Sequence, residues 1–328
     1  MGHFTRAAEE LYLAQPSLSR QIAVLEAGLG QVLFERGPAG AMLTHAGEVL
    51  LPIARRILAD AEAAAAEMDA LAGLRRGRVR LGAPPTLCVS VVAEMLAGFR
   101  AEHPGVELEV MEAGSHTLAQ ALAEGRLDLA LTVDRGPVPA GVSSEALFTE
   151  ELVVAAARET GWDAGAGSGG HRQGLGRAAL FLGAGGPAAT GLAPQLLDGE
   201  PVTLAQLAAV PQVAFNRSYE LRQATDAAFA AAGLSPVTAV EGAEMDAVLR
   251  FVERGIGVAV VPATILLGRP RLAGSRLVRP SLTRTVTLSS RTGGVLDDAA
   301  RAMRALTLAT VERLVAPGSE LSALLTRA

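Results

Sequence analysis

Between Arg78 and Val315, short apolar runs that fit β-strands alternate with longer stretches whose apolar residues recur at helical spacing. Alternation of this kind predicts an α/β fold built on a mostly parallel sheet. The predicted strands are 79–82, 106–111, 127–133, 151–157, 212–215, 237–241, 257–261 and 285–290.

Polar residues follow several of these strands, where an α/β fold places its ligand crevice and the first turns of its helices. Donors of this type would hold a small carboxylate or a similar polar metabolite, with Arg217 as a counter-charge. Helix capping is the alternative explanation for Thr86 and Ser115. The candidate effector-binding residues are Thr86, Ser115, Thr132, Asn216, Arg217 and Glu241.

The first 45 residues hold two short helical patterns separated by a turn near Tyr12–Ala14. Ala7, Ala8 and Leu11 form one apolar face, and Leu18, Ile22 and Leu25 recur at i, i+4 and i+7. Pro16 stands in the first turn of the second helix, where proline is tolerated. The pattern predicts either a helix-turn-helix that reads DNA or an inert helical hairpin with a solvated polar face.

A long helical pattern follows from about Thr44 to Leu74. Its apolar residues alternate spacings of four and three, which is typical of a coiled-coil seam, and the alternative is a helix packed on its own domain. Pro52 would kink the first turns or mark the true start of this helix. The seam comprises Leu50, Ala54, Ile57, Ala61, Ala64, Met68 and Leu71.

The stretch FTRAAEELYLAQPSLSRQIAVLEAGLGQVLFER, followed by LTHAGEVLL, resembles the N-terminal domain of LysR-type transcriptional regulators. EGRLDLAL, VTLAQLAAVPQVAF and LRFVERGIGVAVVP resemble the effector domain of the same family. The resemblance implies a winged helix-turn-helix, a long linker helix, and a two-lobed α/β effector domain similar to periplasmic binding proteins.

The same resemblance implies roles for individual residues. Gln15, Pro16, Ser17 and Arg20 would approach bases, and Thr5, Arg6, Ser19 and Arg36 would hold phosphates. In the effector domain it favours Thr86, Ser115 and Asn216 as contacts to an inducer.

On this template, the DNA-binding domain covers residues 1–45, and the linker helix with its Arg75–Arg78 hinge covers 46–76. The effector domain spans 78–316, with lobe one at 78–157 and 270–316, lobe two at 158–268, and a tail at 317–328. The family has a complete helix ahead of the position of Thr5, so we expect an incomplete winged domain here.

The composition restricts the cell compartment and the kinds of partner that we expect for the protein. The chain of 328 residues carries a formal net charge of −5, and its 29 basic residues are all arginine. Residues 1–80 hold nine arginines and nine carboxylates, so the basic footprint expected for phosphate binding is absent. The single cysteine, Cys88, fits a reducing cytoplasm and predicts a small buried hydrophobe rather than a redox sensor. No apolar run is long enough to cross a membrane.

Nothing in the sequence indicates catalysis, a metal or a cofactor. The five histidines lack metal-ligand spacing, and no nucleophile elbow occurs. A loose dinucleotide pattern at 182–188 falls in a glycine- and alanine-rich stretch, 161–197, that we expect to be a mobile loop.

We therefore expect a homodimer or homotetramer that binds promoter DNA, responds to a small-molecule effector and contacts RNA polymerase. The alternative is a small-molecule binding protein with a non-functional, truncated DNA-binding domain.

Overall fold

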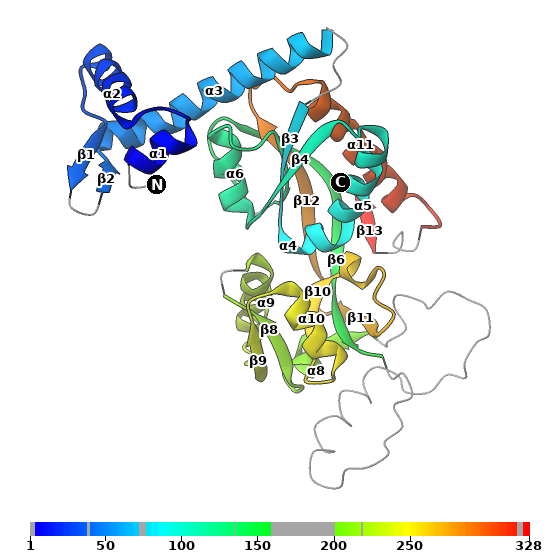
Figure 1. Ribbon diagram of the computed structural model, residues 1–328. Coiled ribbons are helices and arrows are strands. Elements are labelled where there is room, and N and C mark those ends of the chain that lie inside the picture. Colours follow the sequence, from blue (N-terminus) through cyan, green and yellow to red (C-terminus); the bar gives the residue numbers. More distant parts are fainter. Residues whose placement is uncertain are drawn as a thin grey trace, which may run out of the picture.

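The computed structural model describes residues 4–37, 40–71, 77–134, 136–158, 201–217, 219–319 and 324–328. A small N-terminal head lies at one end of a long helix, and a two-lobed body packs along the other end (Figure 1). The predicted mobile loop at 161–197, the dinucleotide-like pattern and the arginines at 75 and 76 lie outside the described residues.

The head consists of α1 (Phe4–Glu10), α2 (Gln15–Leu29) and a hairpin of β1 (Phe34–Gly37) and β2 (Gly40–Leu43). Pro16 occupies the first turn of α2, and Gly30 ends the helix with a φ of 66°, a left-handed conformation that favours glycine. The predicted helix-turn-helix and wing are confirmed.

The core of the head is small. Ala8, Leu18 and Leu33 are buried, but Leu11 and Leu25 remain 58% and 45% exposed. The apolar faces predicted from the spacing are therefore only partly covered. Helical spacing places residues on one side of a helix, but burial also requires another element against that side.

The long helix α3 (His45–Leu71) connects the head to the body. The Thr44 hydroxyl accepts the Gly47 N–H at 3.1 Å and donates to the Val32 carbonyl at 2.6 Å, which ties the helix start to the head. Pro52 lies inside α3, so it does not mark the start of the helix.

The body is built on a nine-stranded sheet with the order β4-β3-β5-β12-β6-β11-β7, to which β10 and β13 add by pairing with β6. The expectation of a mostly parallel sheet is wrong, because β6 pairs antiparallel with β10, β11, β12 and β13. The strands are β3 (Gly77–Ala83), β4 (Val106–Glu112), β5 (Leu129–Val133), β6 (Val142–Ala157), β7 (Val202–Thr203), β10 (Ala259–Pro262), β11 (Leu272–Val278), β12 (Leu282–Arg291) and β13 (Leu325–Arg327).

The 16-residue strand β6 joins the two lobes. Its first part pairs with β12 in lobe one, and its last part pairs with β10 and β11 beside lobe two (Figure 1). The strands β6 and β12 are neighbours in the sheet and run in opposite directions between the lobes. This part of the sheet is therefore antiparallel. Strand β11 also pairs with β7 on the lobe-two side, although residues from 270 onward were expected in lobe one.

Helices cover the sheet in lobe one, and a smaller layer forms lobe two (Figure 1). Lobe two has its own parallel pair, β8 (Gln212–Phe215) and β9 (Thr238–Gly242). The body helices are α4 (Pro85–Leu87), a π-helical turn (Cys88–Val92), α5 (Ala93–Glu102), α6 (Ser115–Ala123), α8 (Leu204–Ala208), α9 (Glu220–Ala231), α10 (Met245–Glu253), a 3-10 turn (Ala263–Leu266) and α11 (Asp298–Val315).

Candidate DNA interface and effector cleft

The polar flank of α2 is accessible. Leu18 is the buried residue of this helix, whereas Pro16, Ser17 and Arg20 are exposed on its other sides. Gln15 and Ser19 are partly exposed, and the Gln15 amide donates to the Ser19 hydroxyl at 2.8 Å. The helix can therefore present a neutral polar surface with one guanidinium to a groove.

The candidate phosphate contacts surround this helix. Thr5 and Arg6 are exposed on α1, and Arg36 lies on β1, with its side chain outside the described part. The Glu26 carboxylate accepts the N–H groups of Leu33 and Phe34 at 2.8 and 3.3 Å, which fixes the wing against the end of α2.

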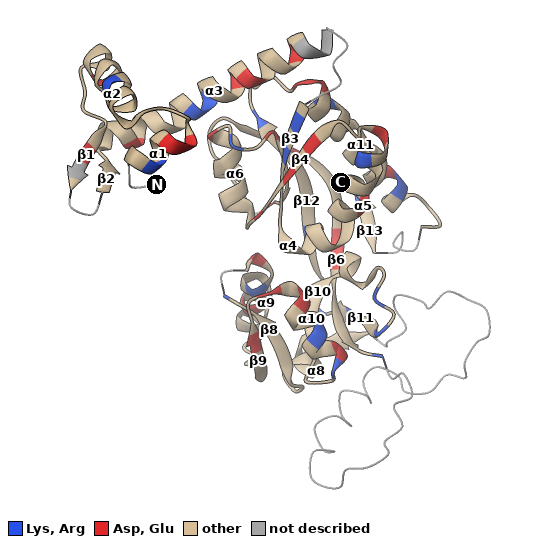
Figure 2. Ribbon diagram, viewed as in Figure 1, with Lys and Arg blue, Asp and Glu red and all other residues tan. Residues whose placement is uncertain are grey.

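The head carries charges of both signs (Figure 2). Helix α1 has one arginine beside Glu9 and Glu10, and α2 has Arg20 together with Glu26. The attraction of the head for the phosphate backbone of DNA therefore depends on a few arginines.

A cleft of about 1230 Å³ separates the two lobes. Three of the candidate effector residues, Thr86, Ser115 and Thr132, line it, and all three are buried in lobe one. Lobe two contributes Tyr219, Glu220 and Glu244 among others. The volume exceeds the usual range for a drug-sized ligand, as expected for a cleft open to solvent.

The other three candidates do not line this cleft. Asn216 and Arg217 precede α9, and the Arg217 carbonyl accepts from the Gln223 amide at 3.2 Å. The Glu241 carboxylate lies 3.6 Å from the Arg222 guanidinium of α9. Glu241 lies near the end of β9, and its side chain faces the neighbouring helix.

Hydroxyl groups cover the floor of the cleft. The Thr132 hydroxyl lies 2.7 Å from that of Thr287 and 2.9 Å from that of Ser289, and Ser144 lies 2.8 Å from Ser289. These side chains come from β5, β12 and β6, so the sheet itself sets their spacing. Hydroxyls both donate and accept, which suits a polar ligand.

An ion pair lies where the strands cross between the lobes. The guanidinium of Arg284 approaches the fully buried Glu150 carboxylate at 2.6 Å and donates to the Thr86 hydroxyl at 2.8 Å. Glu150 also accepts from the hydroxyl of Thr264 at 2.9 Å. Thr86 is thereby a member of this hinge network as well as of the cleft wall.

The N-terminus of α6 faces lobe two across the cleft. Both oxygens of the Glu220 carboxylate accept from Ser115, one from its N–H at 2.8 Å and one from its hydroxyl at 3.0 Å. The Ser115 hydroxyl in turn accepts the N–H of Val133 at 2.9 Å.

Sequence reasoning missed Glu220, Arg284 and Tyr219. An acidic residue in the first turn of a helix, such as Glu220 in α9, is ordinarily explained by the helix dipole. The sequence held no sign of its partner 105 residues away. Arg284 had no local signal, since only the crossing of two strands brings it to Glu150.

Burial and nearby carboxylates shift two groups of the cleft region. Burial, and then the charge of Glu112, raise the pKa of the Cys88 thiol to about 11. Burial, followed by the charges of Glu244 and Glu112, raises the pKa of Tyr219. The thiol and the phenol are therefore neutral near pH 7.

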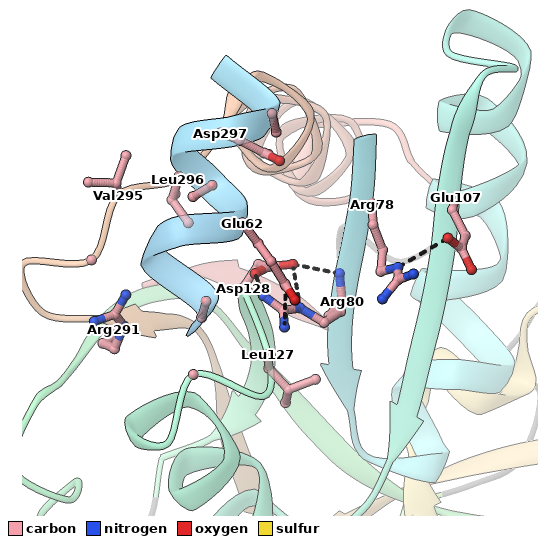
Figure 3. A pocket seen from close by; sticks show the side chains of 15 residues that line it. Glu62, Arg78, Arg80, Glu107, Leu127, Asp128, Arg291, Val295, Leu296 and Asp297 are labelled. Atoms are coloured by element: carbon pink, nitrogen blue, oxygen red, sulfur yellow. Dashed lines mark hydrogen bonds and ion pairs between the residues drawn. The ribbon is translucent and has the colours of Figure 1, made fainter. Parts of the chain in front are cut away.

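A smaller cavity of about 340 Å³ lies between α3 and lobe one (Figure 3). In it Arg80 binds Asp128 at 2.8 Å and lies 3.6 Å from Glu62 of α3. Asp297 caps α11 by accepting the Ala300 N–H at 2.8 Å, and burial raises its pKa. Arg80 thereby joins Glu62 of the linker helix to the body, whereas Arg78 pairs with Glu107 within the body.

Further ion pairs between α3 and the body lie outside the centre of this cavity. Arg55 binds Glu124 at 3.0 Å, Arg301 binds Glu67 at 2.7 Å, and Asp60 pairs with Arg291. The orientation of the linker helix therefore depends on charges along its length.

The described residues contain no cluster of three metal-binding side chains. Within the same residues, no helix combines the length and the apolar character that crossing a bilayer requires.

Two family models match the chain. Residues 1–48 match the bacterial regulatory helix-turn-helix protein, lysR family, and residues 72–167 and 187–312 match the LysR substrate binding domain. The chain belongs to the LysR family. The head thus corresponds to the helix-turn-helix domain of the family, and the cleft lies in its substrate-binding domain.

Relatives of this LysR-family chain include a probable hydrogen peroxide-inducible genes activator of Streptomyces viridosporus, 31% identical over 89% of this chain and 84% of the relative. The nitrogen assimilation regulatory protein nac of Klebsiella aerogenes is 36% identical over 48% of this chain. That match spans about half of the relative, 52% of its length. The crystal structure of ArgP from Mycobacterium tuberculosis shares the fold, with a TM-score of 0.65, 20% identity, and coverage of 97% of this chain and 93% of that one.

Proposed function

We propose that this protein is a transcriptional regulator that binds promoter DNA through α2 and the wing, and responds to a small molecule in the interlobe cleft. The observation that carries the proposal is the accessible polar flank of α2 on a head that matches the family's DNA-binding domain. Base-edge contacts are assigned to Gln15, Pro16, Ser17 and Arg20, and phosphate contacts to Thr5, Arg6, Ser19 and Arg36.

The protein acts as a homodimer or homotetramer in this proposal, because a second recognition helix doubles the contact with a pseudo-palindromic site. Helix α3 offers a surface for a second copy. Ile57, Ala61, Ala64 and Met68 follow the spacing of the predicted seam, and all four are exposed. The setting is the cytoplasm, and RNA polymerase is the protein that the DNA-bound regulator contacts.

The effector carries a carboxylate or a similar polar group. Backbone N–H groups at the start of α6, together with the hydroxyls of Thr86, Ser115 and Thr132, are suited to hold such a group. A contribution of Asn216, Arg217 and Glu241 requires a movement of lobe two, since these residues lie outside the cleft lining.

The experiment is a titration of the full chain with labelled fragments of its own upstream DNA at several salt concentrations. We expect one fragment to bind far more tightly than a scrambled fragment of equal length, and the affinity to rise as the salt is lowered. Equal binding to both fragments, or none, would favour a small-molecule binding protein with a silent head.

A further inference from the structure

A direct contact across the cleft joins Glu220 of lobe two to Ser115 of lobe one. Its two hydrogen bonds, at 2.8 and 3.0 Å, connect a carboxylate at the start of α9 to the first N–H and the first hydroxyl of α6. Charge-assisted bonds to a helix N-terminus are stronger than neutral ones.

The geometry is that of a bound carboxylate ligand. Ser115 is buried, and its hydroxyl is oriented by the Val133 N–H, so both donors are fixed before any ligand arrives. Glu220 uses one oxygen for each donor, as a free carboxylate would. Unlike a free ligand, the Glu220 carboxylate is covalently attached to lobe two.

The surroundings oppose release of this carboxylate into the cleft. Glu112, Asp134 and Glu244 also line it, so three more carboxyl groups surround the cleft. Among the described lining residues the one guanidinium is that of Arg284, which Glu150 already neutralises. Among the described residues that line the cleft, Ser115 therefore offers the Glu220 carboxylate its most favourable partner.

We propose that Glu220 is a built-in occupant of the carboxylate seat at Ser115, and that it holds the two lobes together until an effector carboxylate displaces it. The inference rests on the proposed function in one respect, namely that the cleft is the effector site. It adds that Glu220 determines which effectors bind, because an incoming carboxylate must compete with a tethered one.

An effector that wins this competition frees Glu220 and loosens the lobes. Because a tethered group has a high effective concentration, the effector needs additional contacts to displace it, for which the hydroxyls of Thr132 and Thr287 are in place. A simple carboxylate such as acetate lacks these contacts and cannot displace Glu220.

The test is chemical rescue of Glu220→Ala in the full chain. The variant leaves the seat of Ser115 empty, so its Tm should fall below that of the natural chain, and sodium acetate should raise it again. Sodium chloride at equal ionic strength should not. The Tm of the natural chain should respond equally to both salts.

Asp226→Ala is the matched control. Asp226 lies on the same helix and pairs with Arg222 at 2.7 Å, away from the N-terminus of α6. Its loss should give no response specific to acetate. Amide hydrogen exchange gives a second measurement: exchange at Ser115 and Val133 should accelerate in Glu220→Ala and slow again with acetate.

If Glu220→Ala fails to fold, Glu220→Ser provides the same comparison, since its short side chain also leaves the seat of Ser115 empty. The proposal is overturned if acetate and chloride act alike on the variants, or if exchange at Ser115 is unchanged. Neither measurement uses DNA or an effector, so this outcome is independent of whether the protein regulates transcription.

Discussion

Arg20 is the one positive charge on the exposed flank of α2. A guanidinium can donate two hydrogen bonds to the edge of a guanine, and a well-placed pair of this kind discriminates by about 1–3 kcal/mol. Arg20→Ala should therefore reduce the preference for the natural fragment over a scrambled one by about tenfold to a hundredfold.

Competition binding with the two fragments measures this loss. Arg254→Ala is the control, because Arg254 is exposed in lobe two, far along the chain from the head. Undiminished discrimination in Arg20→Ala would show that other residues read the bases.

The thiol of Cys88 should be unreactive. With a pKa of about 11 rather than 9.0, its thiolate population at pH 8 falls about a hundredfold. A disulfide reagent should therefore modify the native protein far more slowly than the unfolded one. Modification at the rate of a free thiol would contradict the raised pKa of the partly buried Cys88.

The same shift affects stability at high pH. The folded chain keeps the Cys88 proton up to about pH 11, while the unfolded chain loses it near 9.0, so raising the pH through this interval favours unfolding. Cys88→Ala should lose less stability than the natural chain between these pH values, as followed by urea unfolding.

Two adjacent carboxylates on β6 should differ sharply in their contribution to stability. Glu150→Ala leaves the Arg284 guanidinium buried without its counter-charge, which costs about 3–5 kcal/mol of unfolding free energy. Glu151 pairs with Arg276 at 3.4 Å in a partly exposed position, so Glu151→Ala should cost less than about 1 kcal/mol. Urea unfolding compares them, and equal losses would contradict a stabilising role of the buried ion pair of Glu150.

At the scale of elements, α3 combines two roles on different sides. Asp60, Glu62 and Glu67 pair with arginines of the body, while the seam residues Ile57, Ala61, Ala64 and Met68 are exposed. The sequence predicted the seam from its spacing, and the structure adds the charged side that holds the helix to lobe one.

Ile57→Asp should convert the protein to monomers, because Ile57 is 63% exposed on the seam and a charge there cannot be buried against a second copy. Sedimentation velocity measures the mass. Val237→Asp is the control, since Val237 is similarly exposed but lies in lobe two. An unchanged mass for Ile57→Asp would place the interface elsewhere.

At the scale of the whole molecule, the head provides few cations for DNA. Arg6, Arg20 and Arg36 are the arginines of residues 1–45, and each neutralised phosphate adds about 0.9 to the salt slope. Two heads should thus give a slope of log K against log salt no steeper than about −5. A much steeper slope, measured by fluorescence anisotropy, would mean that the body also binds DNA.

The sequence predicted the order of elements well because strands and helices are encoded by local periodicity. The helix α2 and the strands β3, β4, β8 and β9 lie close to their predicted positions. Thr86, Ser115 and Thr132 line the cleft because each follows or ends a strand of lobe one, and their role in effector binding stays a prediction. Strands β11 and β13 were missed, since their short apolar runs resemble loops.

By itself the sequence determined the helix pair, the long helix and the alternating body, since each depends on residues that are neighbours in the chain, and the resemblance to the family supplied the wing. The tertiary structure alone decided the antiparallel crossing of β6 and β12, the ion pair of Glu150 with Arg284, and the contact of Glu220 with Ser115. These depend on which distant segments meet, and local periodicity carries no information about that. Burial then sets the strength of each contact, because charges removed from water must find their partners within the protein.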